Sequence, residues 1–132
     1  MQVIDYPSKR GGFGFEVVGE SHYQRTLRDL DAGRRDRGEE VHFRVFLWPE
    51  PENRYDSNAV AVYAEGHGVI GHIPRVNAAE IQIPLLKMRS DRQVASCNAM
   101  LIGGGPDKPF LGVVLGLDAS ALIGHRFDQP TT

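Results

Sequence analysis

Residues 50–58, with the sequence Glu-Pro-Glu-Asn-Arg-Tyr-Asp-Ser-Asn, gather side chains that can do chemistry in one short stretch. Pro51 stiffens the backbone, Tyr55 offers an aromatic face on which a base can stack, and Asp56 can accept a hydrogen bond from a hydroxyl group. Stacking and hydroxyl recognition are the two requirements of a site that holds a nucleotide end. The stretch therefore predicts a small binding site.

The same residues also permit a purely structural interpretation. Asp56 and Asn58 are typical of turns whose side chains bond to the backbone, and Tyr55 would then pack over the turn. The sequence of the loop leaves both interpretations open.

Other reactive side chains lack the spacing that catalytic or metal sites need. The histidines never pair at the i, i+2 or i, i+4 spacing of metal ligands, so we predict no metal and no cofactor. Asp56 and His72 lack the acidic cluster of a metal-dependent nuclease. Cys97 falls within an apolar strand pattern and is predicted to be structural. Residues 103–105, three glycines, lack the lysine of a phosphate loop and predict a hairpin turn. We therefore predict a protein that is not an enzyme.

Composition limits the classes of protein further. The 132 residues are 41% hydrophobic and 24% charged, which fits one compact domain. A formal net charge of -2 argues against a protein that coats nucleic acid through bulk charge. The single cysteine excludes an internal disulfide and favours a cytoplasmic location. No apolar run approaches the roughly 20 residues that cross a bilayer, so no membrane association is expected.

Hydrophobic periodicity predicts the elements that must position the loop. Alternation with period two predicts six strands, at residues 13–19, 41–48, 59–64, 69–73, 94–101 and 110–117. Apolar positions at helical spacing predict a short helix from Ser21 to Gly33 and a second near residues 77–88. Pro84 should break the second helix or begin a new one. In the strand at 41–48, Phe46 and Trp48 should point outward.

The chain ends look different from its middle. Residues 1–12 are polar and rich in glycine, so we expect a flexible segment and order from about Phe13. Residues 118–132 are weakly patterned and predict a C-terminal tail, disordered in its last four residues. The domain should span residues 13–117. Its order of elements predicts a mainly β fold with two short helices (α+β), a curved six-stranded antiparallel sheet or partly open barrel.

Three ordered segments resemble the HIRAN domain family. They are Val18-Gly19-Glu20-Ser21-His22-Tyr23, then residues 50–62 from Glu50 to Val62, then Val69-Ile70-Gly71-His72-Ile73-Pro74-Arg75. The resemblance covers roughly residues 13–117, and the middle segment is its most distinctive part. HIRAN domains occur in helicase-like transcription factors of the SNF2 type and as small stand-alone bacterial proteins, which this chain resembles more.

The resemblance implies an OB-like or SH3-like barrel that captures the 3′-hydroxyl end of single-stranded DNA. It places Tyr55 against a base and Asp56 near the terminal hydroxyl. It implies further contacts from the positions that match the rest of the motif: Ser21, His22, Tyr23, Asn53 and His72. Ser21 and His22 replace an arginine and an aromatic residue of the family, and Arg54 replaces a proline and restores positive charge. Arg75 adjoins His72 and is expected to contact the DNA backbone.

We therefore predict a non-catalytic module that binds ends of single-stranded DNA during repair or replication-fork processing. In a bacterium it would be associated with the nucleoid, and a DNA-repair protein is a candidate partner. The alternative is a protein-interaction module that docks a partner on the same barrel through Phe46 and Trp48.

Overall fold

The computed structural model describes the backbone of residues 1–128 and the side chains of residues 1–124. Its helices are α1 (Gln24–Asp31), α2 (Arg75–Ser90) and α3 (Ala119–Asp128), and a 3-10 turn, η1 (Glu20–Tyr23), precedes α1. Its strands are β1 (Gln2–Asp5), β2 (Phe15–Glu16), β3 (His42–Pro49), β4 (Val60–Ala64), β5 (Gly68–His72), β6 (Gln93–Gly103) and β7 (Leu111–Gly116). None of the helices in the described part of the chain is long and apolar enough to cross a membrane.

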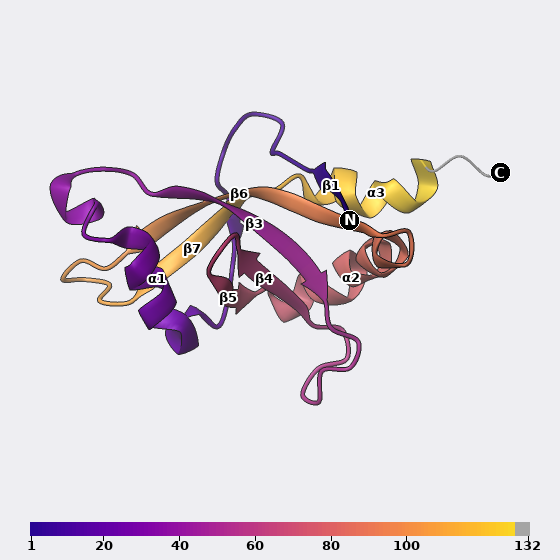
Figure 1. The fold of residues 1–132 in the computed structure, drawn as a ribbon, viewed down its shortest axis with the longest axis horizontal. Coiled ribbons are helices and arrows are strands. Elements are labelled where there is room, and N and C mark those ends of the chain that lie inside the picture. Colours follow the sequence, from indigo (N-terminus) through magenta and orange to yellow (C-terminus); the bar gives the residue numbers. More distant parts are fainter. Residues whose placement is uncertain (129–132) are drawn as a thin grey trace.

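The strands form one sheet in the order β2-β7-β6-β3-β4-β5, and every neighbouring pair on this path is antiparallel. The sheet curls into a half-barrel, with the long strands β3 and β6 crossing its middle (Figure 1). The predicted mainly β fold with a curved antiparallel sheet is therefore confirmed, although the sheet has a seventh strand, β1, which pairs in parallel with β6, and the chain has a third α-helix, α3.

The two ends of this path meet beyond β2. Val18 forms an isolated antiparallel bridge with His72 of β5, in which each backbone N–H donates to the other residue's carbonyl at 2.9 and 2.8 Å. Gly71 makes the approach possible, because a Cβ at this position would lie 2.5 Å from Val17 Cγ1 and 2.8 Å from the Val18 carbonyl oxygen. The chain thus closes the curled sheet through a short bridge.

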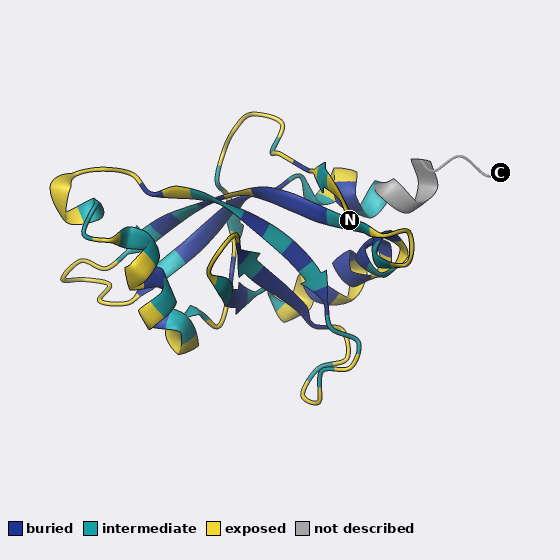
Figure 2. Cartoon of the chain, viewed as in Figure 1, coloured by how far each residue is buried: buried dark blue, intermediate teal, exposed yellow. Residues whose placement is uncertain are grey.

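Alternation along the strands sorts side chains between the core and the outer face. Buried and partly buried residues alternate along β3 (Figure 2). Val45 and Leu47 are buried in the core, whereas Phe46 and Trp48 are only partly buried and lie on the opposite face. The prediction that Phe46 and Trp48 point outward is confirmed. Inside, the apolar side chains of the strands pack with Leu27 of α1. α1 and α2 lie at opposite ends of the sheet (Figure 1).

The expectation that Pro84 interrupts the second helix is wrong. α2 runs unbroken from Arg75 to Ser90 with Pro84 inside it. Ala78, Ile81, Leu85 and Met88 form its buried face, and α2 packs against β6 and α3. Burial of this face offsets the roughly 3 kcal/mol that an internal proline costs a helix.

The first residues also differ from the expectation that order begins at Phe13. Gln2–Asp5 forms β1, which pairs in parallel with β6 from Gln93 to Ser96. Tyr6 is buried, and Pro7 forms a bridge with Leu117. Beyond the end of β7, the first part of β6 has a free edge, and β1 satisfies the backbone groups there.

The C-terminal segment is a helix in its described part, where a weakly patterned tail was expected. Asp118 Oδ1 accepts a hydrogen bond from the Ala121 N–H at 3.0 Å, which caps the first turn of α3. Leu122 is fully buried, and α3 packs against α2. The predicted disorder of residues 129–132 lies outside the described residues.

Candidate nucleic-acid interface

A pocket of about 390 Å³ lies where the loop after β3 meets the bridge that closes the sheet. It brings together four predicted site residues from two segments that are distant in the sequence, and a fifth that begins α2. The lining residues are Val18, Asn53, Tyr55, Asp56, Ala59, His72, Ile73 and Arg75.

Asn53 builds the loop from its centre. Its Oδ1 accepts hydrogen bonds from the backbone N–H groups of Tyr55 at 2.9 Å and Asp56 at 3.1 Å. Its Nδ2 donates to Glu50 Oε1 at 3.2 Å. One asparagine side chain therefore fixes the backbone that carries both Tyr55 and Asp56.

The two carboxylate oxygens of Asp56 have different partners, a backbone N–H group of the loop and an arginine. Its Oδ1 accepts the backbone N–H of Asn58 at 2.9 Å, and its Oδ2 lies 3.4 Å from Arg75 Nε. The side chain of Asp56 is 23% exposed and that of Arg75 is 77% exposed, so the pair opens to solvent on the arginine side. Each carboxylate oxygen has a second lone pair, which can accept a hydrogen bond from a hydroxyl group.

Tyr55 does not pack over the loop, as the structural interpretation would require. The residue is 88% exposed, and only its backbone is held: its N–H by Asn53, and its carbonyl oxygen by Arg75 Nη2 at 3.4 Å. The part of that interpretation that concerns Asp56 is confirmed, because its side chain does bond to the backbone of the turn. The aromatic face of Tyr55 is free to stack.

Glu50 belongs to the site although sequence reasoning did not select it. Its Oε1 lies 2.9 Å from His72 Nε2 and also accepts the bond from Asn53. The carboxylate thus links the loop to β5 and orients the imidazole beside the pocket. The sequence shows that Glu50 lies at the start of the proline-rich loop. It does not show that Glu50 pairs with a histidine 22 residues away.

The remaining predicted residues lie outside this pocket. Ser21, His22 and Tyr23 form η1, which packs against β5, and Ser21 lines a neighbouring pocket of about 410 Å³. That second pocket is also lined by Gly19, Glu20, Lys108, Pro109, Phe110, Leu111 and Gly112. Arg54 is exposed on the loop. Only Val18, just before η1, reaches the pocket of Tyr55 and Asp56.

Outside the pocket, the thiol of Cys97 is buried. Burial raises the pKa of the Cys97 thiol to about 12, which keeps it protonated and a poor nucleophile. Within the described residues, no three side chains of histidine, cysteine, aspartate or glutamate are grouped so that they could hold a metal ion.

Comparison with known proteins gives one family and one structure. The model of the HIRAN domain family matches residues 11–104. No curated protein matches the chain. Among solved structures, the crystal structure of the HIRAN domain of human HLTF is similar at 16% identity and a TM-score of 0.30. The match covers 70% of this chain and 92% of that chain.

Proposed function

The chain belongs to the HIRAN domain family, and we propose that it is a non-catalytic module that holds the 3′-hydroxyl end of single-stranded DNA in the pocket around Tyr55 and Asp56. The observation that carries the proposal is the pairing of an exposed aromatic ring with a sheltered carboxylate on a rigid loop. Tyr55 would stack on the terminal base, and Asp56 would accept the hydrogen bond of the terminal hydroxyl.

Arg75 supplies the charge that the phosphate next to the end requires. Its guanidinium lies beside Asp56 and is mostly exposed, so it can pair with a phosphate oxygen while it stays close to the carboxylate. Arg75 is also the first residue of α2, and the N-terminus of a helix favours a negative charge nearby. The guanidinium of Arg75 would therefore pair with the phosphate of the terminal nucleotide, while the carboxylate of Asp56 beside it would bind the hydroxyl of the same nucleotide.

The carboxylates of the site set its selectivity. Asp56 repels a terminal phosphate and accepts a terminal hydroxyl, and Glu50 adds a second negative charge nearby. One or two base stacks contribute about 1–3 kcal/mol each. We therefore expect micromolar affinity that depends on the chemistry of the end and little on strand length beyond the nucleotides in contact.

Residues outside the pocket would contact the strand as it approaches. Ser21, His22 and Tyr23 lie on η1 beside β5, and Arg54 is exposed next to Tyr55. We also propose a role in DNA repair or replication-fork processing, since both processes produce free 3′ ends.

Oligonucleotide titration tests this proposal. Labelled oligothymidylate with a 3′-hydroxyl is titrated with the protein, and unlabelled competitors are added: the same strand, the strand with a 3′-phosphate, and a closed circle of equal length. We expect the 3′-hydroxyl strand to compete at least about tenfold better than the other two, since one lost charged hydrogen bond amounts to about 1.5–3 kcal/mol. Equal competition by the circle would overturn end recognition.

A further inference from the structure

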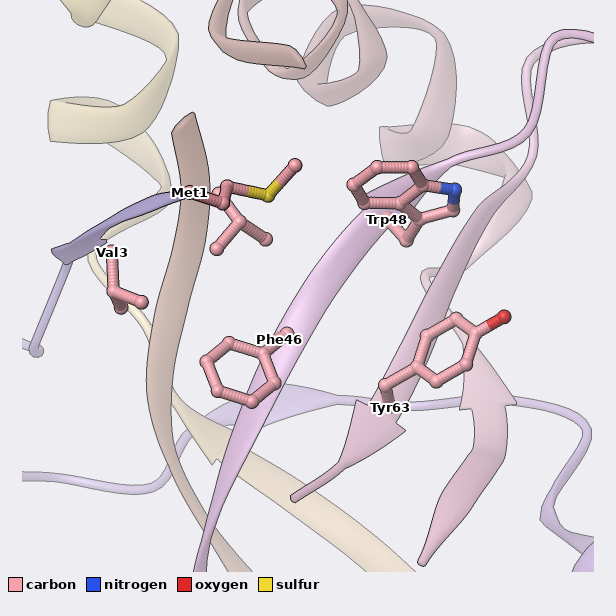
Figure 3. A pocket seen from close by; sticks show the side chains of 6 residues that line it. Met1, Val3, Phe46, Trp48 and Tyr63 are labelled. Atoms are coloured by element: carbon pink, nitrogen blue, oxygen red, sulfur yellow. The ribbon is translucent and has the colours of Figure 1, made fainter. Parts of the chain in front are cut away.

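An apolar pocket of about 320 Å³ lies on the outer face of the sheet, away from the core. Three aromatic side chains dominate it, Phe46 and Trp48 of β3 and Tyr63 of β4, and we call these three residues the aromatic face (Figure 3). The rest of the lining is Met1, Val3 and Val94. All three rings are partly buried, and they lie side by side on neighbouring strands, because Phe46 and Tyr63 are paired in register.

The strand register connects the aromatic face to the pocket of Tyr55 and Asp56. Trp48 pairs with Ala61, Ala61 pairs with His72, and His72 pairs with Val18. Directly paired residues of neighbouring strands point to the same side of a sheet. This row therefore begins at the aromatic face and ends at His72 and Val18, which line the proposed site for the DNA end. Trp48 and His72 are two strand spacings apart, about 10 Å.

Two arginine side chains lie beside the rings of the aromatic face. The guanidinium carbon of Arg44 lies 5.4 Å from the centre of the Phe46 ring, and that of Arg89 lies 5.7 Å from the Trp48 ring. Arg44 is paired with Asp5 at 3.0 Å. Arg89 donates to the Pro49 carbonyl at 3.3 Å and has no carboxylate partner within the described residues, so its charge is available.

We propose that the aromatic face continues the DNA site and stacks the bases that lie 5′ to the held end. This inference rests on the proposed function, because the 3′ end in the pocket of Tyr55 and Asp56 sets the register of the strand. Aromatic rings at a surface groove, with arginines beside them, are the chemistry by which single strands are bound without sequence preference. The row from His72 to Trp48 places the end pocket and the aromatic face on one side of the sheet, about two strand spacings apart, and no acidic residue is among the residues that line the apolar pocket.

The chain carries its own reporter, since Trp48 is its single tryptophan. Its fluorescence is recorded while oligothymidylates of two and of eight nucleotides, both ending in a 3′-hydroxyl, are added to the full chain. Stacking of a base on the indole quenches its emission. We expect quenching by the eight-nucleotide strand and none by the dinucleotide, which fills only the end pocket. Equal fluorescence changes for the two lengths would overturn the proposal.

Variants then measure what the aromatic face contributes to affinity. Trp48→Leu and Phe46→Leu retain apolar volume but remove a stacking surface. Each should weaken binding of the labelled eight-nucleotide strand by at least about fivefold, the low end for one lost stack, and leave dinucleotide binding unchanged. Ile83→Ala, an apolar side chain of α2 that is 48% exposed, is the matched control. Thermal unfolding verifies that each variant is folded.

Arg89→Gln retains all three rings of the aromatic face and removes the positive charge beside Trp48, together with the hydrogen bond to the Pro49 carbonyl. For the eight-nucleotide strand, the slope of the logarithm of the binding constant against the logarithm of the salt concentration should become shallower by about one unit, the release of one counterion. The slope for the dinucleotide should not change. This variant keeps the test decisive if a leucine variant fails to fold.

The outcomes separate this proposal from the proposed function. If both lengths bind with 3′-hydroxyl preference and the leucine variants lose nothing, the aromatic face is not part of the DNA site, although end recognition stands. If the dinucleotide shows no preference for a 3′-hydroxyl, the proposed function itself fails. If the leucine variants change only the sedimentation of the protein alone, the aromatic face binds a second copy of the chain and the proposal is wrong.

Discussion

Tyr55 and Asp56 are neighbours in the sequence but have opposite environments. The tyrosine is 88% exposed, whereas the aspartate side chain is 23% exposed and bonded to both Asn58 and Arg75. This contrast assigns them different tasks at the scale of single residues. The ring of Tyr55 can stack on a ligand without any loss of packing in the fold. The carboxylate of Asp56 is held in one position, where it can accept a hydrogen bond from a hydroxyl group of a ligand.

Replacing Tyr55 by alanine therefore separates binding from stability. Tyr55→Ala should weaken binding of a short 3′-hydroxyl oligonucleotide by about fivefold or more, because it removes a base stack of about 1–3 kcal/mol. The free energy of unfolding should stay within about 0.5 kcal/mol of the original value, since the ring is exposed. Fluorescence anisotropy and urea denaturation measure the two quantities. Tyr55→Phe keeps the ring and should retain the affinity; an equal loss in both variants would contradict stacking.

Asp5 makes stability depend on pH. The Ser96 hydroxyl and the Arg44 guanidinium both donate to its carboxylate, and they lower the pKa of Asp5 below its ordinary value of 3.8. The folded pKa is the lower one, so the carboxylate stabilises the fold above pH 3.8 and this stabilisation is lost as pH falls through the folded pKa.

In Asp5→Asn we expect a lower melting temperature than in the original chain at pH 6 and a smaller difference at pH 3. The effect should be small, because the Asp5 side chain is 64% exposed. Differential scanning calorimetry across this range measures it. Asp107→Asn, in an exposed turn, is the control. A difference that grows toward pH 3 would have the wrong sign for a lowered pKa.

At the scale of elements, the loop between β3 and β4 shows how far a sequence can be interpreted. Its composition predicted an irregular turn that carries Tyr55 and Asp56, and the structure shows such a loop, in which both residues line one pocket. The sequence alone did not show that Asn53 organises the loop or that Glu50 bonds to His72. Several side chains in this stretch can bond to nearby backbone groups, and the choice between them depends on the path of the chain.

Substitution of Asn53 should therefore reduce stability and binding more than substitution of a surface asparagine. Asn53→Ala removes the acceptor for two backbone N–H groups, and we expect a loss of about 1 kcal/mol in the free energy of unfolding. The same change should weaken oligonucleotide binding by more than fivefold, because it releases Tyr55 and Asp56 together. Asn77→Ala, an exposed position of α2, provides the comparison. Normal affinity in Asn53→Ala would show that the loop does not need this asparagine.

Helix and strand predictions failed where packing overrides local preference. Pro84 has the wrong backbone for the middle of a helix, yet α2 continues through it because one face of the helix is buried. Gln2–Asp5 forms a strand because an edge of β6 is available to it. Neither partner is visible in the local pattern of the residues concerned.

At the scale of the whole molecule, the site exists because the sheet closes. Val18 and His72 are far apart in the sequence, and their bridge brings the segment before η1 against β5, where the pocket forms. The strands themselves were predictable from period-two alternation. Which strands meet at the closure was not, since any of several edges could have paired with the short β2 segment.

Gly71 provides the test of closure. A methyl group at this position would collide with Val17 and with the Val18 backbone, so Gly71→Ala should cost about 1–3 kcal/mol in stability. It should also weaken binding of the DNA end, because the bridge forms one wall of the pocket. Gly14→Ala, whose new Cβ meets nothing within 4 Å, should change neither quantity. Unchanged binding in Gly71→Ala would mean that the closed sheet is not needed for the site.

The most direct test of the account is the ratio of dissociation constants for 3′-phosphate and 3′-hydroxyl strands, measured in the original chain and in Asp56→Asn. Glu52→Gln, which removes the same charge from an exposed neighbour on the loop, is the control. We predict a ratio of about ten or more in the original chain and in Glu52→Gln, and a ratio near one in Asp56→Asn, because the carboxylate is the discriminating group. A ratio that is the same in all three proteins would contradict recognition of the hydroxyl end by Asp56.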